Sequence, residues 1–98
     1  MSFKVFVSPQ AEADFDAVLN YLFTEWGQKT ALDFIGKVEQ TLSTISESPE
    51  LFACKNKKKK IHQCVINPRV ILYYKISGSE IELITFFQTR QHPGKLKF

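Results

Sequence analysis

Positively charged side chains are concentrated in the second half of this 98-residue sequence. Residues 53–98 contain ten lysines and arginines against two acidic residues, a net charge of +8, whereas residues 1–52 carry a net charge of −5. Five of the ten cations stand between Lys55 and Lys60, and two others are Arg69 and Arg90. Ammonium groups and guanidinium forks bind phosphate and carboxylate oxygens. The charge split therefore predicts a polyanion or an acidic partner on one face of the molecule.

The cysteines and histidines do not form a metal-binding pattern. Cys54, His62, Cys64 and His92 lack the paired short spacings of a zinc site, so we expect no metal and no other cofactor. Two cysteines and no signal peptide at the start of the chain indicate the reducing cytoplasm. No apolar run approaches the roughly 20 residues that cross a bilayer, so no membrane contact is expected.

The first half of the sequence predicts a strand and two helices. Residues 3–7 alternate with the period of a strand, and Ser8-Pro9 supplies an N-cap and a first-turn proline for a helix that ends at Gly27. One apolar stripe of that helix consists of Phe15, Val18, Leu19, Leu22 and Trp26. The stripe of the second helix consists of Ala31, Ile35, Val38, Leu42 and Ile45. Ser48-Pro49 stops this helix, so the two should form an antiparallel hairpin, with Trp26 interpreted as a packing residue.

The second half changes to the period of strands. Residues 61–66, 70–76 and 80–87 are rich in β-branched and aromatic side chains, and turn-forming clusters at 67–68 and 77–79 separate them. These runs predict a three-stranded antiparallel meander.

The element order predicts an α+β fold, β-α-α-β-β-β. We expect the helical hairpin to pack on a small, mainly antiparallel four-stranded sheet. A length of 98 residues with 44% hydrophobic content is enough for one core, so residues 1–98 are expected to form a single domain.

At this level of detail the chain resembles the RelE/ParE toxin superfamily, and its helical hairpin is most similar to the ParE-like branch. The similarity in the hairpin rests on residues 8–15 (Ser-Pro-Gln-Ala-Glu-Ala-Asp-Phe), Tyr21, Glu25-Trp26-Gly27, Ala31 and Phe34-Ile35. Residues 68–76 are similar to the arginine-led central strand of the family, and residues 81–87 with 89–93 to its last strand and arginine end. The resemblance covers nearly the whole chain. It implies a toxin of a bacterial type II toxin–antitoxin module, silenced by a tightly bound antitoxin.

The superfamily has two modes of action, and the resemblance alone does not choose between them. RelE-like members cut messenger RNA on the ribosome, whereas ParE-like members bind DNA gyrase and are not nucleases. Cleavage by attack of a 2′-hydroxyl needs a group that takes the proton, cations that stabilise the phosphorane, and a proton donor for the leaving oxygen. No metal is obligatory for this reaction.

The resemblance to the nuclease branch implies roles for individual residues. The implied catalytic set is Arg69, Arg90, Lys58, Lys60 and His92. The two arginines match by position those that contact the scissile phosphate, and the two lysines approach the first meander strand, where nuclease members carry catalytic lysines. His92 would transfer protons near neutral pH. The residues expected to bind RNA or its phosphates are Lys55, Lys57, Lys59 and Tyr73, the last by stacking on a base.

Each of these residues also has a structural explanation. The lysine run fits a solvated loop or a binding site for an acidic antitoxin tail, Arg69 and Arg90 could cap strand carbonyls or form surface ion pairs, and His92 could be an ordinary exposed histidine. Residues 95–98 also contain no tyrosine, where many nuclease members keep one.

Two function hypotheses follow, with a third outcome beside them. The convergence of cations and a histidine favours a metal-independent endoribonuclease that cuts messenger RNA on the ribosome. The alternative is a DNA gyrase poison without nuclease activity, and a degenerate toxin that only binds its antitoxin is the third. In each case we expect an antitoxin segment, acidic or amphipathic, along the basic sheet face or across the helical hairpin, in a toxin–antitoxin hetero-oligomer.

Overall fold

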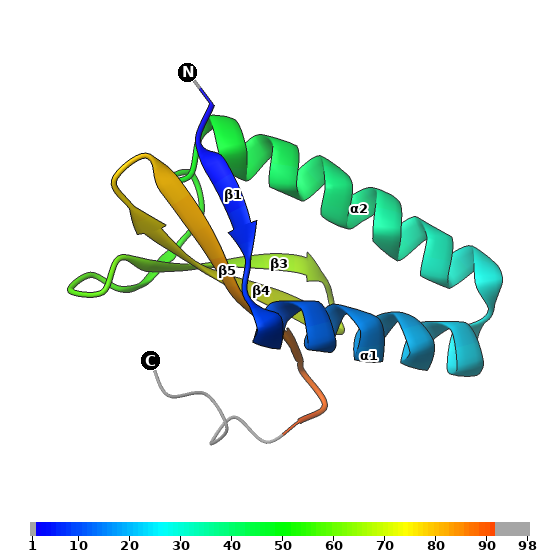
Figure 1. Cartoon of the computed structure of the whole chain (residues 1–98). Coiled ribbons are helices and arrows are strands. Elements are labelled where there is room, and N and C mark those ends of the chain that lie inside the picture. The colour runs from blue at the N-terminus through cyan, green and yellow to red at the C-terminus, as the bar shows by residue number, and fades with distance from the viewer. Residues whose placement is uncertain (1, 92–98) are drawn as a thin grey trace.

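The computed structural model describes residues 2–91, which form a helical hairpin packed on one sheet (Figure 1). The elements are β1 (Lys4–Val7), α1 (Pro9–Trp26), α2 (Gln28–Glu47), β2 (Cys54–Asn56), β3 (Ile61–Asn67), β4 (Val70–Ser77) and β5 (Glu80–Gln88). The predicted α+β class and the order of its main elements are confirmed.

The two helices begin and end where local chemistry dictates. Ser8 caps α1, because its Oγ accepts a hydrogen bond from the backbone N–H of Ala11 at 3.0 Å, and Pro9 follows as the first helical residue. Gly27, with φ of +95°, is the single residue between α1 and α2. This backbone conformation suits glycine and lets the chain reverse within one residue.

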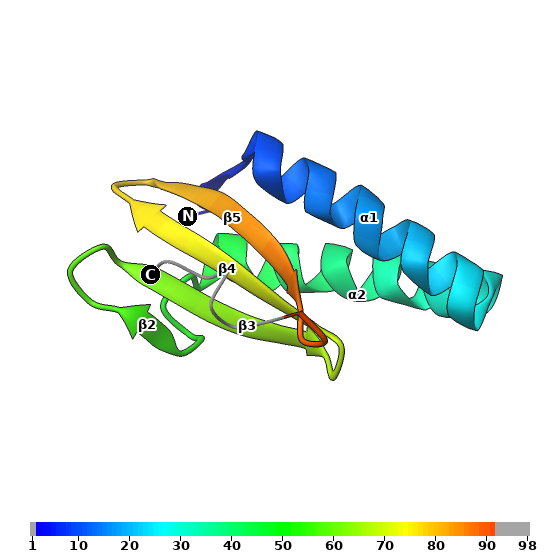
Figure 2. The same cartoon turned by 90° about the horizontal axis from the view of Figure 1, so that it is seen from below.

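The sheet has five strands in the order β1-β5-β4-β3-β2 (Figure 2). β1 is parallel to β5, with Val5 opposite Ile81, and the other neighbours are antiparallel. The prediction of four strands missed β2, a three-residue strand that pairs with the start of β3. Its sequence, Cys-Lys-Asn, has neither alternation nor β-branched residues, so sequence pattern gives no sign of it.

Both helices lie on one face of the sheet, and the main core fills the space between them (Figure 2). Its fully buried members include Leu22, Phe34, Ile45, Leu72 and Tyr74. The opposite face carries a smaller apolar cluster of Ile61, Tyr73 and Phe87, with Ile71 and Ile84 packed against it. The central strand β4 is therefore apolar on both sides, as expected for a strand buried on two faces.

Three segments outside the strands carry the charged residues of interest. The β3–β4 turn carries Arg69, and the chain just past β5 carries Arg90, so both lie at the same end of the sheet. The β2–β3 turn carries Lys57–Lys60 at the opposite end, next to the β4–β5 turn, because the N–H of Ile76 donates to the carbonyl of Lys60. Figure 1 shows this turn projecting from the end of the sheet that lies away from the α1–α2 connection.

None of the helices in the part of the chain that the structure describes is both long and apolar enough to span a bilayer.

Candidate functional site

Arg69 and Arg90 are held side by side by the residue between β5 and Arg90. The backbone N–H of Thr89 donates to the carbonyl of Arg69 at 2.9 Å, and its Oγ1 donates to the carbonyl of Pro68 at 3.0 Å. The backbone N–H of Arg69 donates to Oδ1 of Asn67 at 2.8 Å, which fixes the turn before β4. The two arginines, 21 residues apart in sequence, therefore lie next to each other at one end of the sheet.

Each guanidinium lies over an aromatic ring of helix α1. The guanidinium carbon of Arg69 is 4.0 Å from the ring centroid of Trp26, and that of Arg90 is 4.2 Å from the ring centroid of Tyr21. Such a contact is a cation–π interaction, and it uses the face of the guanidinium and not the N–H groups at its rim. Arg90 also donates from Nε to Oε1 of Gln88 at 3.0 Å.

A small pocket lies between these groups. Its volume is about 170 Å³, and its lining residues are Tyr21, Arg69, Gln88, Thr89 and Arg90. No lysine, histidine or carboxylate from residues 2–91 is among them. We call this cavity the arginine pocket. A liquid water molecule takes up roughly 30 Å³, so the pocket has room for a phosphate or carboxylate group with its bound water.

The structure does not bring the predicted lysines to the arginine pocket. Lys58 and Lys60 lie in the β2–β3 turn with Lys57 and Lys59, before β3 begins, and Lys55 lies in β2. Arg69 follows the far end of β3, a strand of seven residues. At a rise of about 3.3 Å per residue the two groups are roughly 20 Å apart. The catalytic and phosphate-binding roles of the five lysines stay predictions, but they are not roles in one compact site with Arg69.

Tyr73 lies in the apolar cluster on the face opposite the helices, where only 3% of its surface is exposed. Burial raises the pKa of its hydroxyl. A ring that a nucleobase is to stack on must be accessible, so this position gives no support to the predicted base stacking. The other central tyrosine, Tyr74, belongs to the main core. His92 lies outside the described residues.

His62 and Cys64 both have structural roles. Nδ1 of His62 lies 2.9 Å from the carbonyl of Phe52, and its ring stacks on Tyr74 with centroids 5.5 Å apart. Cys64 is buried in the main core, where burial raises the pKa of its thiol. Among residues 2–91, no three His, Cys, Asp or Glu side chains are grouped so that they could hold a metal ion.

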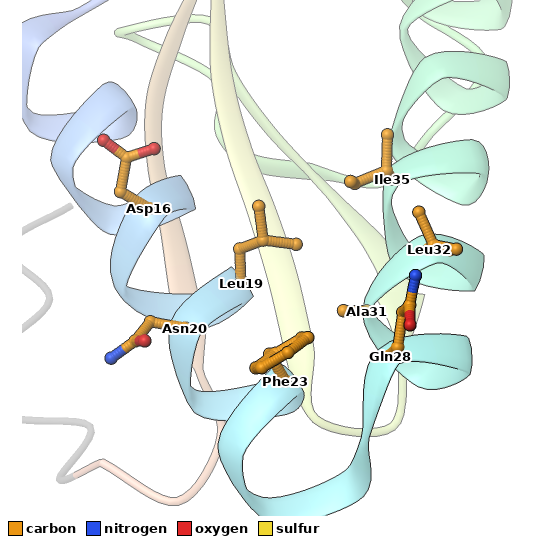
Figure 3. A pocket seen from close by; sticks show the side chains of 8 residues that line it. All are labelled: Asp16, Leu19, Asn20, Phe23, Gln28, Ala31, Leu32 and Ile35. Carbon is orange, nitrogen blue, oxygen red and sulfur yellow. The ribbon is translucent and has the colours of Figure 1, made fainter.

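A second concave surface lies between the two helices (Figure 3). It has a volume of about 450 Å³ and is lined by Asp16, Leu19, Asn20, Phe23, Gln28, Ala31, Leu32 and Ile35. Figure 3 shows the apolar side chains of α1 and α2 facing each other across this space. We call it the hairpin groove. Phe23 and Leu32, each 57% exposed, are unusually accessible for large apolar residues.

The aromatic partners of the arginines were missed from the sequence. Trp26 was interpreted as a packing residue, yet 52% of its surface is exposed and it lies under Arg69. Tyr21 contributed only to the family resemblance. No local pattern marks either residue, because the contact depends on how α1 crosses the end of β5.

The element order and the two arginines at one end of the sheet are those expected of the small α+β toxins of type II toxin–antitoxin systems. Within this class the chain belongs to the ParE toxin family, because the family described as ParE toxin of type II toxin-antitoxin system, parDE, matches residues 5–93. No curated protein sequence matches the chain.

Solved structures agree with this fold. The chromosomal ParDE toxin–antitoxin system of P. aeruginosa matches with a TM-score of 0.73 and 12% identity, over 89% of this chain and 96% of that one. The YoeB dimer from Staphylococcus aureus matches with a TM-score of 0.61 and 17% identity, over 88% and 95%. The E. coli DinJ-YafQ toxin-antitoxin complex matches with a TM-score of 0.62 and 10% identity, over 92% and 96%. At these identities the likeness extends to the fold alone.

Proposed function

We propose that this toxin arrests growth by binding DNA gyrase, as ParE-like members do, and not by cutting RNA. We propose the arginine pocket as the contact surface. The observation that carries the proposal is the composition of the arginine pocket. Two guanidinium groups can hold an anionic group of a target, but transfer of a proton from a 2′-hydroxyl needs a base beside them. The lysines predicted to be catalytic lie roughly 20 Å away, at the other end of β3.

Messenger RNA cleavage remains the second candidate, and one observation favours it. A pair of arginines on one small pocket is a suitable stabiliser for a phosphorane, since guanidinium groups donate several hydrogen bonds to phosphate oxygens. This candidate requires a base and an acid from outside the described lining of the pocket.

A single culture experiment separates the two candidates. The protein is induced, and RNA 5′ ends and gyrase-linked DNA breaks are mapped in the same cells. We expect DNA breaks with messenger RNA left whole. Cleavage within translated codons, without gyrase-linked breaks, would establish the nuclease and overturn the proposal.

Variants of the two arginines connect the outcome to the pocket. Arg69→Ala and Arg90→Ala should each remove growth arrest and the DNA breaks, because each loses one of the two guanidinium groups. Lys37→Gln, which removes one charge from the exposed surface of α2, is the matched control and should leave both intact. Full growth arrest by both arginine variants would show that the arginine pocket is not the contact surface.

We also propose that the cognate antitoxin places an amphipathic helix in the hairpin groove. The groove exposes apolar side chains from both helices and has Asp16 at its edge, within the half of the chain that carries a net charge of −5. An amphipathic helix with basic residues beside its apolar stripe complements that surface. Apolar side chains that become buried on binding dominate the binding energy. Truncating both Phe23 and Leu32 should therefore weaken antitoxin binding at least tenfold.

This binding mode is tested by calorimetric titration of the antitoxin into the double variant Phe23→Ala/Leu32→Ala. The control is Leu51→Ala/Val65→Ala, which truncates two exposed apolar residues outside the groove. We expect weakened binding for the first variant and unchanged binding for the second. Equal affinities for the two variants would place the antitoxin elsewhere, with the basic sheet face as the next surface to test.

A further inference from the structure

The β2–β3 turn is a dense group of positive charges with a fixed backbone. Asn56 accepts a hydrogen bond at Oδ1 from the backbone N–H of Lys59 at 3.0 Å, and the N–H of Lys60 donates to the carbonyl of Lys57 at 3.3 Å. Lys60 has φ of +57°, the left-handed conformation that closes the turn onto β3. All four lysines of the turn are exposed, as is Lys55 just before it.

Among residues 2–91, no carboxylate forms an ion pair with these charges. Within residues 2–91 the one ion pair joins Lys29 to Asp33, on the opposite half of the chain. The five ammonium groups of residues 55–60 therefore lie close together in water without a carboxylate partner in the described part of the molecule. Their mutual repulsion is relieved by any ligand that brings several negative charges at once.

The composition of the turn favours a nucleic-acid backbone over a protein surface. Residues 55–60 contain no apolar side chain, whereas the centre of a protein–protein interface is apolar and depleted in lysine. Lysine is a flexible point charge that contacts phosphates without reading bases, and such contacts supply most of the sequence-independent affinity of nucleic-acid-binding proteins.

We infer that the β2–β3 turn is a sequence-independent contact to the phosphate backbone of a nucleic acid, separate from the arginine pocket. The separation of roughly 20 Å corresponds to about six nucleotides at the 3.4 Å per charge of one duplex strand. One strand can therefore reach the lysines while the arginine pocket is engaged with the target. The inference rests on the proposed function only in that both modes of toxin action place the protein beside DNA or RNA.

The test is the salt dependence of binding to a fluorescent duplex DNA and to a single-stranded RNA of the same length. The variant Lys57→Gln/Lys58→Gln/Lys59→Gln leaves the left-handed Lys60 in place. Each phosphate contact contributes about 0.9 to the slope of log affinity against log salt on duplex DNA and about 0.7 on a single strand. The slope of this variant should therefore be shallower by about 2 to 3.

The matched control is Lys4→Gln/Lys29→Gln/Lys37→Gln, which also removes three positive charges, but from the first half of the chain. We expect its slope to equal that of the unaltered protein. Equal slopes for both triple variants, or loss of slope in both, would overturn the inference, since the turn would then be no special contact. The comparison of DNA with RNA shows which backbone is preferred.

An acidic antitoxin tail is the rival ligand, and the same variants distinguish it. If the turn variant binds antitoxin more weakly and keeps its slope on both nucleic acids, the turn is a protein contact and the inference is wrong. The proposed function has its own measurement, the gyrase-linked DNA breaks. If those breaks occur and the turn variant keeps the salt slope of the unaltered protein, the inference alone is refuted. The expected slopes without such breaks refute the proposed function alone.

Discussion

Arg69 lies over Trp26, with its guanidinium carbon 4.0 Å from the ring centroid, although the two residues are 43 positions apart in sequence. The contact links the end of α1 to the turn before β4. A stacked arginine has fewer accessible rotamers than a free one, so less entropy is lost when its N–H groups bind an anion. We therefore expect Trp26 to act as a positioning residue for the arginine pocket.

Replacing Trp26 by leucine should weaken toxicity with little loss of stability. The ring is half exposed, where a cation–π contact contributes about 0.5 to 1 kcal/mol, so the free energy of unfolding should fall by about 1 kcal/mol or less. Growth arrest after induction should decline because Arg69 loses its fixed orientation. Trp26→Phe keeps a ring under the guanidinium and should therefore retain growth arrest. Loss of growth arrest in this variant too would show that stacking is not the function of Trp26.

The two glycines of the helical hairpin should respond to alanine with opposite signs. Gly27 has φ of +95°, so Gly27→Ala forces a side chain into a strained backbone and should destabilise the protein by about 1 kcal/mol or more. Gly36 lies inside α2 with open space around the position that an added methyl group would take, so Gly36→Ala should stabilise the protein by about 0.5 to 1 kcal/mol. Urea unfolding measures both, and a Gly27→Ala variant as stable as the unaltered protein would contradict the role assigned to Gly27.

Ser8 connects α1 to β5, and its loss should be more costly than that of an ordinary helix cap. Its Oγ accepts from the N–H of Ala11 and also donates to the carbonyl of Ile84 at 3.1 Å. Ser8→Ala removes both bonds and should lower the free energy of unfolding by about 1 to 2 kcal/mol. Ser43→Ala, at an exposed position of α2, should change it by less than about 0.5 kcal/mol. Similar losses for the two serines in thermal unfolding would argue against a special role for Ser8.

The buried hydroxyl of Tyr74 should make the protein sensitive to alkali. It donates to the carbonyl of Pro49 at 2.6 Å, and burial raises its pKa above the ordinary value of 10.0. The folded state therefore keeps a proton that the unfolded chain releases. The contribution of Tyr74 to the free energy of unfolding is constant below about pH 10. It falls as the pH rises beyond 10, by up to about 1.4 kcal/mol per pH unit.

Tyr74→Phe tests this expectation by denaturant unfolding at several pH values. The variant should be less stable near neutral pH by about 1 to 3 kcal/mol, because the carbonyl of Pro49 loses its donor. Its stability should also fall less steeply above pH 10 than that of the unaltered protein. An identical alkaline slope would show that Tyr74 does not govern this transition; Cys64, whose pKa burial also raises, contributes in the same direction.

The elements of this fold were predictable because their signals are local. The apolar stripes of the two helices, the cap at Ser8 and the turn at Ser77-Gly78-Ser79 each appear within a few residues, and the structure has the helices and the main strands where these patterns place them. The partnership of Arg69 with Trp26 was not predictable, since it depends on how a helix crosses the sheet. The separation of Lys60 from Arg69 follows from the seven-residue strand β3 between them, whereas their common charge carries no information about distance.

The position of β5 has a consequence for synthesis of the chain. β1 precedes the other strands of this sheet along the chain, yet within the described residues it pairs with β5 alone, and β5 separates it from the rest of the sheet. Until residues 80–88 have left the ribosome, β1 has no strand beside it and one side of β4 is unpaired. Such contacts between distant segments form late because closing a long loop is entropically costly. A nascent toxin therefore cannot complete this sheet until residues 80–88 are available, and Arg90 becomes available directly after them.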